Sequence, residues 1–256
     1  MYKFMLNETS YHGAGAIKAV PEEIKARGFK KVFVASDPDL VKFGVTKKVT
    51  DLLDEACIEY VLYSNIKPNP TIENVQTGVA AFKEAGADCI VAIGGGSSMD
   101  AAKVMWLMYE HPEVNFDDIK QKFMDIRKRA FKFPELGKKA KLVCIPTTSG
   151  TGSEVTPFAV ITDTKENKKY PLTDYALTPT IAIVDPEFAM SMPPRIAADT
   201  GIDVLTHAIE AYVSILASDF TDGWAKQAVK LVFENLEKSV LEGDPDARIK
   251  MHNAAS

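Results

Sequence analysis

The chain has 256 residues, of which 46% are hydrophobic and 25% are charged. This length is enough to bury a substantial core and is somewhat long for one compact domain. A formal net charge of −5 would repel a phosphate backbone, so we expect no nucleic-acid partner. No basic segment followed by an apolar one opens the chain, and no apolar run approaches the roughly 18 residues of a membrane helix, so we expect neither secretion nor membrane insertion.

The cysteines indicate the compartment. Cys57, Cys89 and Cys144 are far apart and form no CxxC pair, and two of them lie inside apolar, strand-like runs. We expect all three to be buried thiols in a reducing compartment, which points to a cytoplasmic protein.

Short apolar runs rich in Val and Ile alternate with amphipathic stretches through the first two thirds of the chain. The runs predict β-strands at 31–36, 59–64, 89–96, 141–148 and 180–185. Between them, residues 40–56 and 71–86 carry apolar side chains at helical spacing. This alternation predicts an α/β fold, a parallel sheet with helices on both faces. Segments 156–163 and 168–177 flank a polar turn and predict an antiparallel hairpin at the edge of the sheet.

After residue 120 the sequence changes character. Residues 120–141 carry nine Lys or Arg against two acids, and we expect a solvated helix and loop there in preference to an oligomer contact. After Asp185, prolines and then helical spacing predict a domain boundary near 185. Asp244 before Pro245 predicts a helix start, and no stop signal follows, so we expect the chain to end inside a helix.

The stretch AIGGGSSMDAAK, residues 92–103, follows a predicted strand and opens a predicted helix. Consecutive glycines allow a pyrophosphate to approach the backbone, Ser97 and Ser98 add donors, and the helix N-terminus contributes aligned amides. The alternative is a tight turn capped by a serine, but a cap needs one glycine at most. We therefore interpret Gly95, Gly96, Ser97 and Ser98 as a phosphate-binding loop.

A second Gly and hydroxyl cluster, PTTSGTGSE at 146–154, follows the next buried strand. Parallel sheets bind ligands at the carboxyl ends of their strands, and both clusters are expected at that edge. Together they suggest a nucleotide held between two loops. Asp37 ends the first clear strand and either accepts hydrogen bonds from an adenosine ribose, which favours NAD over NADP, or caps the helix that begins at Pro38. The spacing leaves these two roles open.

Asp203 and His207 lie four positions apart in the predicted helix TGIDVLTHAIEAY. A carboxylate and a neutral imidazole on one helical face suit Fe(II) or Zn(II), but a hydrogen-bonded pair would have the same spacing, and a catalytic metal needs a third ligand. His12, His111 and His252 are expected to be surface or capping residues. We expect the core stripe of this helix to consist of Ile202, Leu205, Ile209 and Val213.

Six motifs together resemble the iron-dependent (group III) alcohol dehydrogenases, over essentially the whole chain. From about Met105 the chain is most similar to the alcohol dehydrogenase half of bifunctional aldehyde-alcohol dehydrogenases, and the first hundred residues are more similar to lactaldehyde or propanediol reductases. The motifs are PNPT (68–71), GGGSSMDAAK (94–103), TTSGTGSEVTPFAVITD (147–163), KYPLTDYALTP (169–179), IVDPE (183–187) and GIDVLTHAIEAYVS (201–214).

The resemblance implies an NAD-binding α/β domain at 1–185 and the start of a helical, metal-binding domain at 186–256, with NAD and a divalent metal between them. It assigns Asp37 to the ribose, Asn69 to a cofactor contact and Lys169 to the nicotinamide side. The two loops match the family's pyrophosphate loop, at Gly95, Gly96, Ser97 and Ser98, and its second cofactor loop, at Thr147, Thr148 and Thr151.

For the metal, Asp203 and His207 match the first two ligands of the family. Its two further histidines would come beyond Ser256, so we expect a truncated site. The activity implied by lineage is NAD- and metal-dependent interconversion of a primary alcohol and its aldehyde, with no side-chain base. The alternative is an inactive NAD-binding fragment or assembly module. A homo-oligomer, in which a neighbouring chain completes the site, is the third expectation.

Overall fold

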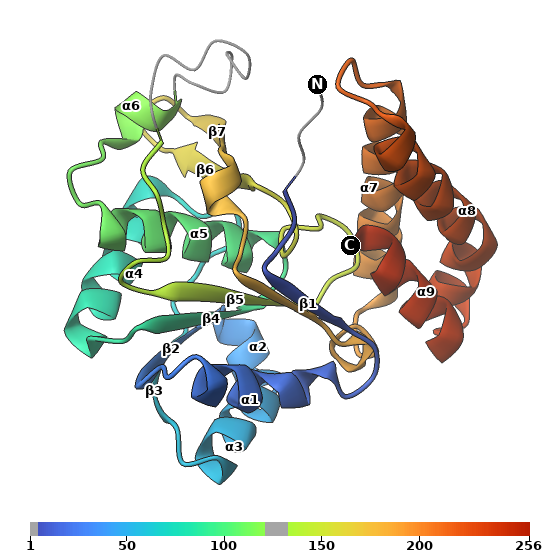
Figure 1. The fold of residues 1–256 in the computed structure, drawn as a ribbon. Coiled ribbons are helices and arrows are strands. Elements are labelled where there is room, and N and C mark those ends of the chain that lie inside the picture. Colours follow the sequence, from blue (N-terminus) through green and yellow to red (C-terminus); the bar gives the residue numbers. More distant parts are fainter. Residues whose placement is uncertain (1–4, 121–132) are drawn as a thin grey trace.

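A computed structural model describes residues 5–120 and 133–256. Its centre is a six-stranded, all-parallel sheet with the strand order β1-β8-β5-β4-β2-β3, which crosses the middle of Figure 1. The predicted parallel α/β fold is therefore confirmed. The strands are β1 (Thr9–His12), β2 (Lys31–Ala35), β3 (Glu59–Tyr63), β4 (Cys89–Gly94), β5 (Lys141–Pro146) and β8 (Ile181–Val184).

Helices cover both faces of this sheet (Figure 1). On one face, α4 (Ile72–Ala85) and α5 (Gly96–Glu110) pack their apolar side chains on the strands around Phe33 and Leu142. On the other, η1 (Ala16–Lys18), α1 (Ala19–Ala26) and α3 (Lys47–Glu55) bury a second apolar layer. Strands β4 and β8 are buried along their whole length. This burial explains why their sequences are the continuous apolar runs from which they were predicted.

Two details of the α/β part differ from the predictions. The expected helix at 40–56 is two helices, α2 (Pro38–Lys42) and α3, because Gly44 adopts a φ of 72° that ends the first. Strand β1 was not predicted, since it is short and its residues alternate between partly buried and exposed. It pairs with β8 at the edge of the sheet.

The predicted hairpin is present, but not in the predicted place. Strands β6 (Phe158–Asp163) and β7 (Lys168–Thr173) form an antiparallel sheet of their own and do not extend the main one. The side chain of Lys103 on α5 bonds to the start of β6, so the hairpin lies over this helix. Short elements flank it: α6 (Phe116–Lys120), η3 (Tyr175–Leu177) and η4 (Pro186–Phe188).

The chain after Pro194 is helical, with α7 (Pro194–Val213), α8 (Asp219–Leu241) and α9 (Pro245–Ala255) grouped at one side of the sheet (Figure 1). As predicted, α9 begins at a cap in which the Asp244 carboxylate accepts from the amide of Ala247. The proposed domain boundary near 185 falls before these helices and remains a prediction.

The predicted core stripe of α7 is wrong. Ile202, Ile209 and Val213 are exposed by 52%, 48% and 71%, and Leu205 is only partly buried. The buried face consists of small residues, Ala197, Gly201, Val204 and Ala208. They allow α8 to approach so closely that a Cβ on Gly201 would lie 2.2 Å from a methyl of Leu236. The larger side chains point outward because the close approach of the helices needs small ones between them.

The cysteine prediction is correct at two positions and wrong at one. Cys89 and Cys144 are buried in β4 and β5, whereas Cys57 is exposed. Cys57 follows α3 with a φ of 55°, which turns the chain into β3. Within the described residues, no helix is both long and apolar enough to cross a membrane. Most of the basic segment 120–141, including residues 121–132, lies outside the described residues.

Candidate functional site

The first Gly-rich loop joins β4 to α5 as predicted. Gly94 has a φ of 154°, Gly95 is the residue before the helix, and α5 starts at Gly96. No side chain caps this helix end in the described structure, so the alternative of a serine-capped turn is not what the structure contains. The amide of Ser98 donates to the carbonyl of Gly95 at 3.1 Å, which leaves the amides of Gly96 and Ser97 to bind an anion. The helix dipole adds to their attraction.

The second loop, after β5, lies directly against the first. The amide of Thr147 donates to the carbonyl of Gly94 at 3.0 Å. A Cβ on Gly95 would lie 3.3 Å from the side chain of Thr148, and one on Gly96 would lie 2.7 Å from that of Thr151. A side chain at Gly96 would therefore clash with the second loop, and one at Gly95 would make a tight contact with it. Four hydroxyls, from Ser97, Ser98, Thr148 and Thr151, are brought to the same edge of the sheet.

Asn69 and Lys169, distant in sequence, also meet at this edge. The ammonium of Lys169 donates to Asn69 Oδ1 at 2.8 Å, and the backbone amide of Asn69 donates to Ser97 Oγ at 3.2 Å. Asn69 has a φ of 52°, a left-handed conformation that asparagine tolerates better than most residues. Three of the residues assigned by resemblance are thus joined by hydrogen bonds.

Asp37 caps α2, because its carboxylate accepts from the amide of Leu40 at 2.9 Å and Pro38 occupies the first helical position. The capping role considered for Asp37 is therefore real. The residue also stands directly after β2, which is the neighbour of β4. A carboxylate at this carboxyl edge is in a suitable place for a ribose as well, so the two roles do not exclude each other.

Asp203 and His207 lie side by side on α7, with Oδ1 and Nε2 separated by 3.6 Å. This distance is too long for a hydrogen bond, so the pair is not the satisfied pair that the spacing alone allows. Their side chains are 40% and 51% exposed, which leaves both accessible to an ion. Within the described residues, no group of three or more His, Cys, Asp or Glu could hold a metal. The pair offers two possible ligands, one fewer than a catalytic metal usually has.

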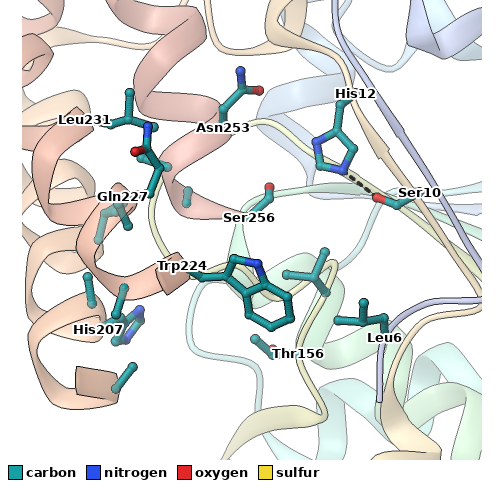
Figure 2. A pocket seen from close by; sticks show the side chains of 18 of the residues that line it. Leu6, Ser10, His12, Thr156, His207, Trp224, Gln227, Leu231, Asn253 and Ser256 are labelled. Atoms are coloured by element: carbon teal, nitrogen blue, oxygen red, sulfur yellow. Dashed lines mark hydrogen bonds between the residues drawn. The ribbon is translucent and has the colours of Figure 1, made fainter. Parts of the chain in front are cut away.

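A cavity of about 690 Å³ separates the helices from β1, and His207 lies on its wall. Figure 2 shows His207 and Trp224 on the helical side, Leu6, Ser10 and His12 on the strand side, and Ser256 between them. The cavity could not be predicted from the sequence, because no local motif unites its walls. They come from β1, the loop after β5, α7, α8 and the end of α9.

The remaining histidines do not join the pair. His12 bonds to Ser10, and His111 bonds to Glu113 and the carbonyl of Glu135 near the surface. His252 was expected at the surface and is instead 1% exposed, with Nδ1 2.9 Å from Ser149 Oγ. Burial, together with the nearby His12, lowers the pKa of His252 to about 4.

The sequence interpretation also missed two charged residues of α5, of which Asp100 is partly buried. Lys103 and Asp100 belong to the quoted loop motif, and Lys103 is fully buried. The signal was present, because two charges three positions apart interrupt an otherwise apolar helix. A charge is retained inside a protein only when it is paired or hydrogen-bonded, as the ammonium of Lys103 is.

An all-parallel sheet with two Gly and hydroxyl loops at the carboxyl ends of adjacent strands defines a dinucleotide-binding α/β protein, here followed by a helical part. Comparison with known sequences agrees. The profile described as "Iron-containing alcohol dehydrogenase" matches residues 7–186, and that of the "Fe-containing alcohol dehydrogenase family, C-terminal" matches residues 197–256. The chain belongs to the iron-containing alcohol dehydrogenase family.

Individual relatives support this assignment. Aldehyde-alcohol dehydrogenase 2 of Entamoeba histolytica is 60% identical over 88% of this chain, which spans only 26% of that protein. NADPH-dependent butanol dehydrogenase of Clostridium saccharobutylicum is 47% identical over 99% of this chain and 62% of its own length. The crystal structure of sulfoacetaldehyde reductase from Bifidobacterium kashiwanohense in complex with NAD+ superposes with a TM-score of 0.86 at 30% identity, over 100% of this chain and 65% of that one.

Proposed function

We propose that this chain binds NAD between its two Gly and hydroxyl loops and contributes half of a metal site to an alcohol dehydrogenase that interconverts a primary alcohol and its aldehyde. The observation that carries the proposal is the close apposition of Gly95 and Gly96 with Thr148 and Thr151. This apposition forms a cradle of free helix amides and hydroxyls that fits a pyrophosphate. A side chain on Gly96 would displace Thr151, and one on Gly95 would crowd Thr148.

The residues around the cradle suit the rest of the cofactor. The carboxylate of Asp37 would accept from the adenosine ribose, and the ammonium of Lys169 would lie toward the nicotinamide, where Asn69 holds it. We propose NAD in preference to NADP because a carboxylate at the ribose repels a 2′-phosphate. Because one relative is named as NADPH-dependent, the ratio of NADH to NADPH affinity is the measurement that tests this preference.

The donor set on α7 suits a divalent ion. A carboxylate and an imidazole, both accessible, are ligands that Fe(II) and Zn(II) accept, so we propose that Asp203 and His207 hold one side of the metal. When bound, NAD carries the hydride and the metal stabilises negative charge on the substrate oxygen. The described residues of this chain position these groups, and we assign no side chain as a general base.

A second candidate function rests on the small number of ligands. Because the described residues contain no group of three metal ligands, the chain by itself could bind NAD without turning over an alcohol. One metal ion per chain after loading with Fe(II) or Zn(II) would favour the enzyme, and NAD affinity without metal uptake would favour this alternative. Assembly with further copies and a cytoplasmic location remain part of the proposal.

Titration with NADH tests the central part of the proposal. We expect Gly96→Ala to weaken NADH binding at least tenfold, since the new methyl would displace Thr151. Gly223→Ala, where a Cβ meets nothing within 4 Å, is the matched control and should leave the affinity unchanged. Equal NADH affinity in the unaltered chain and Gly96→Ala would contradict the proposed site, as would a complete lack of NADH binding.

A further inference from the structure

The buried ammonium of Lys103 is fully used in hydrogen bonding. From the middle of α5, its Nζ donates to Ser153 Oγ at 3.0 Å, to the carbonyl of Thr156 at 2.8 Å and to that of Phe158 at 2.7 Å. Three acceptors match the three donors of an ammonium group. A buried cation is costly unless it is paired and bonded in this way. The Lys103 side chain therefore fixes the backbone at the start of β6 to α5.

Asp100, one turn earlier on α5, holds the same segment. One carboxylate oxygen accepts from Ser153 Oγ at 2.7 Å and the other accepts from the amide of Val160 at 2.9 Å. Ser153 thus accepts from Lys103 and donates to Asp100. Burial raises the pKa of Asp100 and lowers that of Lys103, while the attraction between the two charges opposes both shifts. We call Asp100, Lys103 and Ser153 the α5 clamp.

The clamped hairpin leads back to the phosphate loop. Thr162 on β6 is the partner of Lys169 on β7, and the amide of Thr162 donates to the carbonyl of Pro70 at 2.9 Å. Lys169 bonds to Asn69, and Asn69 bonds to Ser97 in the first turn of α5. The connections therefore form a closed ring that starts and ends on α5.

We infer that the α5 clamp positions the cofactor site, because it sets the distance between the phosphate-binding end of α5 and Lys169. The inference rests on the proposed function, in which these two points hold different parts of one dinucleotide. The hairpin is not part of the main sheet, so its place relative to α5 depends on such side-chain bonds. A buried ammonium with all three of its donors bonded tolerates little displacement, which makes the clamp suited to this task.

A double-mutant cycle tests the clamp. We expect Ser153→Ala to weaken NADH binding about tenfold, the equivalent of one hydrogen bond to a charged group. Affinity for ADP, which occupies only the adenosine and pyrophosphate positions, should change less than about twofold. In the Lys169→Ala background, Ser153→Ala should have no additional effect, because the serine acts through the lysine. Ser239→Ala, a buried serine on α8, is the control for a general loss of stability.

Two results would overturn the clamp: equal losses of NADH and ADP affinity in Ser153→Ala, or additive effects of Ser153→Ala and Lys169→Ala. Amide hydrogen exchange, which needs no ligand, separates this failure from failure of the proposed function. If the unaltered chain binds no NADH, the proposed function fails, while faster exchange in β6 and β7 of Ser153→Ala would still support the clamp. Unchanged exchange in the hairpin would overturn it.

Discussion

The α/β part and the helical part of this chain bury their apolar side chains to different extents. Along β4 every residue is buried, and Phe33 and Phe82 pack together in the layer beside the sheet. In α7 and α8, Val213 and Phe233 are 71% and 77% exposed. Packing within the chain therefore accounts for the α/β fold, while the helices carry exposed apolar side chains that their mutual contacts do not cover.

The two candidate sites differ in the same way. The cofactor loops touch each other and are linked by hydrogen bonds through Asn69 and Lys169. Asp203 Oδ1 and His207 Nε2 are 3.6 Å apart, and both side chains are exposed on the same helix. The residues proposed for NAD are held in place by their neighbours, whereas those proposed for the metal form half of a ligand set.

The largest expected effect tests the contrast in packing. Phe82→Ala should lower the free energy of unfolding by about 3–5 kcal/mol, because it removes a fully buried ring in contact with Phe33 and Tyr109. Phe233→Ala is the matched change on α8 and should alter stability by less than about 0.5 kcal/mol. Urea denaturation measures both. Similar losses of stability in the two variants would contradict the described difference in burial between the two parts.

A second prediction concerns the contact between the two parts. His252 on α9 bonds to Ser149 in the second cofactor loop, and burial lowers the pKa of His252 to about 4 from a usual value near 6.5. Between these values the unfolded chain binds more protons than the folded one. Stability should therefore fall as the pH drops through this window, by at most about 3 kcal/mol from this group.

His252→Asn is the variant that isolates this contribution. An asparagine cannot titrate, but it can place an amide near the position of Nδ1 and keep the bond to Ser149. We expect the variant to lose less stability than the unaltered chain between pH 6.5 and 4, as measured by denaturation at each pH. An identical pH dependence would show that His252 is not buried as described.

A smaller effect is expected from the two faces of α7. Val204→Ala should cost about 2 kcal/mol, because the side chain is 2% exposed and packs in the helical cluster. Ile202→Ala, two residues earlier and 52% exposed, should cost less than about 0.5 kcal/mol. A larger stability loss in Ile202→Ala than in Val204→Ala would contradict the described packing of α7 on α8. It would support the core stripe predicted from the sequence.

The smallest expected change concerns cofactor choice. Asp37→Ser keeps a capping side chain for α2 but removes the charge. The ratio of NADPH affinity to NADH affinity should therefore rise about tenfold, while the stability hardly changes. Asp244→Ser is the same substitution at the cap of α9 and should leave the preference unaltered. Binding titrations with both cofactors measure the ratio. An unchanged ratio in Asp37→Ser would restrict Asp37 to its capping role.

Much of the α/β fold could be predicted because its strands are apolar throughout and are separated by helical spacing. Strand β1 could not be predicted. Residues Thr9 to His12 alternate between partly buried and exposed positions, as a surface segment does, and form a strand only by pairing with β8. The hairpin was predicted in the wrong place, because its position depends on hydrogen bonds from the side chains of Lys103 and Asp100 and not on its own pattern.

The site shows the same division between local and long-range information. The two loops and the Asp203–His207 pair are local motifs and were visible in the sequence. The buried face of α7 was not, because apolar residues occupy two stripes of this helix, and only the close approach of α8 at Gly201 selects the stripe with small side chains. The burial of His252 likewise depends on a partner, Ser149, 103 positions earlier in the chain.

The most direct measurement is amide hydrogen exchange of the unaltered chain with and without saturating NADH. With NADH bound, we predict slower exchange at residues 94–98 and 147–151 and in the segments that carry Asn69 and Lys169, with little change in α8. Protection confined to α7 and α8 around the cavity, or no protection anywhere, would contradict the claim that the two loops form a cofactor site.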